Sequence, residues 1–124
     1  MADGLYFKDS ELYGKIRVEN ENHSIILDAL VDTGAFKTLI PEKVCKDLNL
    51  THIETKKVWG ICPTSVNVNI YLAKVYFLDK WVTNSVIGYD ILSEKQMALI
   101  GRDILTQFDI SITNSKKECK FKEI

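Results

Sequence analysis

Hydrophobic and polar residues alternate along much of this chain, which is the pattern of β-strands with one face buried. The clearest case is residues 12–19, in which every second residue falls on one apolar face: Leu12, Gly14, Ile16 and Val18. Residues 20–23 are polar, and residues 24–31 then carry apolar side chains on both faces. We predict a β-hairpin whose second arm is covered from both sides.

Further strands are predicted where short apolar runs end at turn residues. Residues 58–68 form a candidate hairpin around Gly60 and Pro63, and its second arm continues to Leu72. Four more strands are expected in residues 75–78, 81–87, 108–112 and 118–121, and a fifth in residues 98–101, where it stops at a glycine. The pattern therefore predicts a mostly β protein.

Two short segments show helical spacing instead. Pro41 is suited to the start of a helix, apolar residues follow at helical intervals, and Asn49 is a plausible left-handed terminator. Residues 102–108 place Ile104, Leu105 and Phe108 on one helical face. We expect two short helices within the β domain.

Length and composition narrow the possibilities. A chain of 124 residues is long enough for one compact domain, here residues 1–124, and too short for two. Its 16 Lys and Arg and 17 Asp and Glu residues give a net charge of −1, and they are scattered, so we expect no nucleic-acid partner. No apolar run approaches the roughly 20 residues that span a bilayer, and the first residues lack a secretion signal. We expect a cytoplasmic protein without a membrane partner.

The cysteines and histidines do not form a metal signature. Cys45, Cys62 and Cys119 are widely spaced, and His23 and His52 are the only histidines in the sequence. We expect free thiols, no metal site and no cofactor.

The candidate chemistry lies in Asp32-Thr33-Gly34, directly after the apolar residues 29–31. An aspartate at the tip of a buried strand can present its carboxylate, and the threonine hydroxyl can fix the loop by hydrogen bonding. The glycine permits a close backbone approach. The alternative is an ordinary turn in which the aspartate accepts backbone hydrogen bonds. Asp28 is too far along the chain to form an Asp-x-Asp pair with Asp32.

This motif and its surroundings resemble the retropepsin-like aspartic proteases. In that family the Asp-Thr-Gly follows a paired strand, a hairpin flap comes next, and two hydrophobic residues and a glycine precede a helix near the C-terminus. These parts correspond here to Asp32-Thr33-Gly34, the hairpin around Trp59, Gly60 and Ile61, and Leu99-Ile100-Gly101 followed by Arg102. The resemblance covers residues 12–113 and implies a single-lobe acid-protease fold.

The resemblance also implies roles for individual residues. Asp32, Thr33 and Gly34 correspond to the catalytic loop, and Gly101 and Arg102 to the structural segment behind it. The substrate would contact Ala35 and the flap residues, although Trp59 could equally be a core residue. The glycine-rich flap tip of the retroviral enzymes is missing here, and Phe36 and Lys37 stand where those enzymes carry an acid that pairs with the helix arginine.

One chain supplies one such aspartate, whereas hydrolysis of a peptide bond by an activated water needs two carboxylates that share a proton. We therefore predict an aspartic endopeptidase that acts on peptides as a homodimer, with both copies of Asp32 near the two-fold axis. The alternative is a peptide-binding or dimerisation module that keeps the fold without cleavage.

Overall fold

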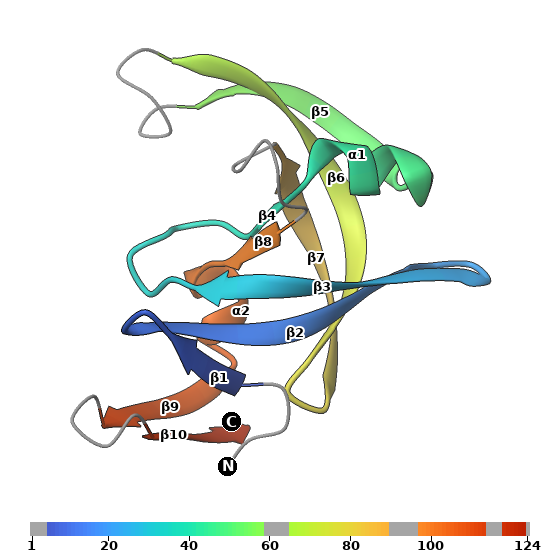
Figure 1. Ribbon diagram of the computed structural model, residues 1–124. Helices are drawn as coiled ribbons and strands as arrows, with labels where there is room; N and C mark the ends of the chain where they lie inside the picture. Colours follow the sequence, from blue (N-terminus) through green and yellow to red (C-terminus); the bar gives the residue numbers. More distant parts are fainter. Residues whose placement is uncertain (1–4, 59–64, 90–96, 114–117, 124) are drawn as a thin grey trace.

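The computed structural model describes residues 5–58, 65–89, 97–113 and 118–123 (Figure 1). These residues form strands and two short helices, α1 (Glu42–Asp47) and α2 (Arg102–Leu105). The strands are β1 (Leu5–Lys8), β2 (Glu11–Asn20), β3 (His23–Val31), β4 (Leu39–Ile40), β5 (Thr51–Val58), β6 (Val66–Phe77), β7 (Lys80–Gly88), β8 (Met97–Ile100), β9 (Phe108–Thr113) and β10 (Glu118–Glu123). The predicted mostly β class with two short helices is confirmed.

The main sheet has eight strands in the order β1-β2-β3-β8-β4-β7-β6-β5. β2 also pairs with β6, so the sheet bends back on itself and encloses the main core. β9 and β10 form a separate antiparallel pair, which lies beyond β1 in Figure 1. Most neighbours are antiparallel, but β3 and β8 run parallel, as do β4 and β7. These parallel pairs bring distant parts of the chain together around β4.

The hairpin predicted from alternation is β2 and β3, paired from Tyr13 opposite Leu30 to Asn20 opposite His23. The four residues of the predicted apolar face of β2 are all buried. The expectation that β3 is covered on both faces is wrong at Ile26, whose side chain is 64% exposed. Ile26 pairs with the exposed Arg17, so this part of β3 turns one face to solvent.

Both predicted helices are present. Pro41 precedes α1, and Asn49 follows it in the left-handed region with a φ of 53°. α2 is shorter than the predicted residues 102–108, because Thr106 caps it and Phe108 already begins β9. The predicted helical face is nevertheless inside, since Ile104, Leu105 and Phe108 are all buried.

The hairpin predicted around residues 58–68 is formed by β5 and β6, with Val58 opposite Val66. Its tip, including Trp59, Gly60 and Ile61, lies outside the described residues. β6 is one continuous strand across two predicted ones, and most of β5 was not predicted because its side chains from Thr51 to Lys57 are all exposed. β1 was also missed.

Buried hydrophobic side chains form a large main core and a smaller second cluster. The second cluster consists of Leu39, Val68, Ile70 and Ile87, with Leu99 packed against it. It lies where β4 meets β7 and β8. Cys45 and Cys119 are buried in the main core, and Cys62 lies outside the described residues. None of the helices that the structure describes is long and apolar enough to cross a membrane.

Candidate active site

Asp32 lies at the end of β3, at the point where the parallel strands β3 and β8 separate. Val31 is opposite Ile100 in the register, and the backbone N–H of Asp32 donates to the carbonyl oxygen of Ile100 at 3.0 Å. This bond extends the pairing one residue past β3. The start of the candidate loop is therefore held by the sheet itself.

The loop then turns tightly over the aspartate side chain. The backbone N–H of Gly34 donates to Oδ1 of Asp32 at 2.9 Å, and the N–H of Ala35 donates to the Asp32 carbonyl oxygen at 3.2 Å. Asp32 is half-buried, whereas Thr33 and Gly34 are exposed. A hydrogen bond from the loop thus fixes one carboxylate oxygen, while the other is not used in this turn. A Cβ atom at Gly34 would lie 3.2 Å from Oδ1 of Asp32, so glycine leaves room for the carboxylate.

Gly101 and Arg102 hold the loop from behind. The N–H of Arg102 donates to the carbonyl oxygen of Ala35 at 2.8 Å. A Cβ atom at Gly101 would lie 2.7 Å from both the carbonyl carbon and the oxygen of Lys37, and 3.0 Å from the Ala35 oxygen. Only glycine permits this approach of two backbones. The structure thus places both predicted structural residues against the candidate loop.

Two residues that the sequence did not single out, Thr38 and Asp103, complete this support. Thr38 is fully buried, and it donates through its N–H to Oδ2 of Asp103 at 3.1 Å and through its hydroxyl to Oδ1 at 2.8 Å. The Thr38 hydroxyl oxygen in turn accepts the N–H of Gly101 at 3.1 Å. The only sequence signals were a threonine just before the apolar Leu39 and Ile40, and an acid in the first turn of a predicted helix.

The Asp103 carboxylate also connects the loop to β7. Asn84 donates to its Oδ2 at 2.7 Å, and the Lys37 ammonium lies 3.8 Å from the same oxygen. Lys37 donates to both the carbonyl oxygen and the hydroxyl of Ser85, at 2.9 and 2.7 Å. This half-buried network joins the residues after Asp32 to α2 and β7, and makes the loop part of one rigid unit.

The Arg102 side chain contacts Phe36 and takes no part in the hydrogen bonds described above. Its guanidinium carbon is 5.8 Å from the centre of the Phe36 ring, and Phe36 is 74% exposed. Among the described residues Arg102 forms no ion pair within the chain. An aromatic contact therefore occupies the place of the acid that was noted as missing from the sequence.

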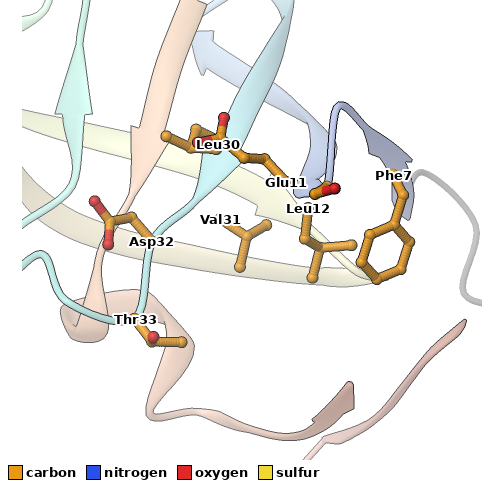
Figure 2. A pocket seen from close by; sticks show the side chains of 8 residues that line it. Phe7, Glu11, Leu12, Leu30, Val31, Asp32 and Thr33 are labelled. Atoms are coloured by element: carbon orange, nitrogen blue, oxygen red, sulfur yellow. The ribbon is translucent and has the colours of Figure 1, made fainter. Parts of the chain in front are cut away.

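A pocket of about 290 Å³ opens beside Asp32. Its lining comes from β1, β2, the end of β3 and the candidate loop: Phe7, Ser10, Glu11, Leu12, Leu30, Val31, Asp32 and Thr33. In Figure 2 Asp32 and Phe7 lie at opposite ends of this lining, with Val31 and Leu12 between them. Asp32 is thus one of the lining residues, and in Figure 2 its carboxylate points away from Val31, Leu12 and Phe7.

Asp28 has a different partner and does not belong to this site. It forms an ion pair with Lys15 at 2.8 Å, and the hydrogen bond from Lys15 is the main reason why the pKa of Asp28 is lowered. Tyr6 lies beside it, and burial together with a hydrogen bond to Asp28 raises the pKa of Tyr6 to about 12. Within the described residues, no group of three or more His, Cys, Asp or Glu side chains could hold a metal ion.

Comparison with known proteins indicates the family of this chain independently of the site geometry. The family model described as retroviral aspartyl protease matches residues 10–113. A comparison with curated protein sequences gave no significant match.

Solved structures share the fold. The EIAV protease in complex with the inhibitor HBY-793 has a TM-score of 0.59 and 17% sequence identity, over 82% of this chain and 90% of that one. A foamy viral protease-reverse transcriptase in complex with double-stranded DNA has a TM-score of 0.57 and 18% identity, over 80% of this chain. The present chain spans only 16% of that viral chain. The absence of a nucleic-acid partner stays a prediction.

Proposed function

We propose, since the chain belongs to the retroviral aspartyl protease family, that it is an aspartic endopeptidase that works as a homodimer with one Asp32 from each subunit. The observation that carries this proposal is the position of Asp32. Its backbone is tied to Ile100 of β8, and its Oδ1 accepts the N–H of Gly34. This is an aspartate held in one geometry at an accessible loop, as a catalytic carboxylate requires.

The reaction needs a second carboxylate. Hydrolysis by an activated water requires one carboxylate as a general base and one carboxylic acid that polarises the peptide carbonyl group. Two aspartates held close together share one proton, because both cannot be ionised at that distance. A two-fold axis beside Asp32 would supply the second aspartate from an identical subunit. The pair would titrate as one coupled unit.

The other residues of the loop would contact the partner subunit or the bound peptide. The exposed Thr33 lies next to Asp32 and would face the same loop of the partner subunit. Ala35 would contact the peptide, together with Trp59, Gly60 and Ile61 at the tip of the β5–β6 hairpin. An extended peptide would bind by adding a strand alongside this hairpin. We also keep a cytoplasmic location as a prediction.

The decisive experiment replaces Asp32 by asparagine, which has nearly the same shape but cannot share a proton. Asp32→Asn is expected to reduce peptide cleavage by about three orders of magnitude or more. Its circular dichroism spectrum and its sedimentation behaviour should match those of the wild type. Cleavage of a denatured protein at the wild-type rate would refute the proposal. A wild-type protein that binds peptides without cleaving them would instead be the peptide-binding module considered above.

A further inference from the structure

The pocket beside Asp32 contains a second carboxylate, that of Glu11, to which the proposed mechanism gives no part. Glu11 is the first residue of β2 and lines the pocket together with Asp32. Four of the eight lining residues are apolar, and no lysine or arginine is among them. In Figure 2 Leu30 lies on the same side of β3 as the Glu11 side chain, so an apolar side chain adjoins the negative charge.

The Glu11 carboxylate is available for a ligand. Its Oε2 accepts a hydrogen bond from the Tyr13 hydroxyl at 3.1 Å on the exposed surface. Lys8 stands opposite Glu11 in the β1–β2 register, but among the described residues no ion pair neutralises Glu11. A cation entering the pocket would meet a carboxylate that has no positive partner.

We propose that this pocket binds a lysine or arginine side chain of the substrate, and that Glu11 selects it. This inference rests on the proposed peptidase function. The methylene groups of such a side chain would pack on Leu30, which Figure 2 shows on the same side of β3 as Glu11, while its charged end would reach Glu11. A volume of about 290 Å³ is near the lower limit of ligand pockets, roughly 300 Å³, and suits one side chain better than a larger ligand.

The position of the pocket fixes which substrate residue occupies it. Because Asp32 forms part of the wall, the bound side chain must belong to a residue next to the cleaved bond. In a symmetric dimer the pocket occurs twice, once on each side of the aspartate pair. A basic residue on either side of the cleaved bond should therefore favour cleavage.

The test compares peptides that differ only in the residue beside the cleaved bond: arginine, norleucine or glutamate. The wild type should prefer arginine over norleucine in kcat/KM and should cleave the glutamate peptide least. In Glu11→Gln the preference for arginine over norleucine should fall about tenfold, the size of one charge-assisted hydrogen bond. Glu11→Lys should favour the glutamate peptide instead.

Two controls separate selection from other effects of the substitution. Glu21→Gln removes the same charge in the exposed turn at the far end of the β2–β3 hairpin, and should keep both the activity and the preference. Tyr13→Phe removes the hydrogen bond to Glu11 but keeps the carboxylate, so the preference should persist.

Several results would overturn the inference. An arginine preference that is equal in the wild type and Glu11→Gln would exclude a selective role for Glu11. If Glu11→Gln weakens the dimer in sedimentation and lowers cleavage of all peptides by one factor, Glu11 contacts the second subunit and not the substrate. If the wild type cleaves none of the peptides, the proposed function fails, and equilibrium binding of the same peptides then tests the pocket. Equal affinity for the arginine and norleucine peptides would defeat it.

Discussion

Thr38 donates its hydroxyl group to Oδ1 of Asp103 at 2.8 Å, and this bond links the loop that follows Asp32 to the first turn of α2. The same hydroxyl oxygen accepts the N–H of Gly101. One buried side chain thus binds both the Gly101 N–H and Oδ1 of Asp103, which also accepts the N–H of Ile104 at 3.0 Å, and the loss of the hydroxyl should be costly.

Thr38→Val keeps the shape of the side chain but removes the hydroxyl. It should lower the free energy of unfolding by about 1 to 3 kcal/mol, because Asp103 and the Gly101 N–H each lose a partner. Urea denaturation measures this change. Thr83→Val is the matched control, since Thr83 is an exposed threonine on β7, and its effect should stay within about 0.5 kcal/mol. Equal effects of the two substitutions would contradict the importance of this bond.

Gly101→Ala should lower stability, whereas Gly34→Ala should lower activity. At Gly101 the added methyl group would lie 2.7 Å from the Lys37 backbone, so the free energy of unfolding should fall by about 1 to 3 kcal/mol. At Gly34 the nearest atom is the Asp32 carboxylate oxygen at 3.2 Å. This variant should remain folded but lose activity, because the carboxylate has to move. Thermal unfolding and peptide cleavage, measured on both variants, separate the two effects.

Mixed dimers test whether each subunit supplies half of the site. Wild-type and Asp32→Asn chains are unfolded together in equal amounts and refolded. Random pairing leaves about a quarter of the dimers with two intact aspartates, so activity per total chain should fall to about a quarter of the wild-type value. If each chain carried a complete site, half of the activity would remain.

The Lys15–Asp28 ion pair predicts how stability depends on pH. Because the hydrogen bond from Lys15 lowers the pKa of Asp28, the ionised carboxylate favours the folded state. This contribution is complete above the unfolded pKa, about 3.9, and is lost as the pH falls through the lower folded pKa. The stability difference between the wild type and Asp28→Asn should therefore shrink below about pH 4.

The stability difference between the wild type and Asp28→Asn should be small. The Lys15 and Asp28 side chains are 58% and 45% exposed, so the difference at pH 7 should be under about 1 kcal/mol. Urea unfolding of both proteins at pH 7 and pH 3 provides the measurement. A difference that grows as the pH falls would show that the sign is wrong.

What the sequence could predict depended on local pattern. Alternation located β2, the polar turn and the apolar run after it located β3, and the motif directly after β3 located Asp32. β5 was largely missed, because a strand whose side chains are nearly all exposed has no apolar face to recognise. The bond from Thr38 to Asp103 was also missed, since a pairing of residues 65 positions apart has no local signal. Glu11 carried no motif, and only the pocket revealed its place beside Asp32.

The parallel pairing of β3 with β8 also sets an order of events during folding. Residues just before Asp32 pair with residues 97–100, so this contact requires closure of a loop that contains about half of the chain. Contacts between such distant segments form slowly, whereas the β2–β3 hairpin needs only its own residues. A nascent chain that still lacks β8 has no strand against which the Asp32 loop can be fixed. The Asp32 loop can therefore reach its final geometry only after β8 has been made.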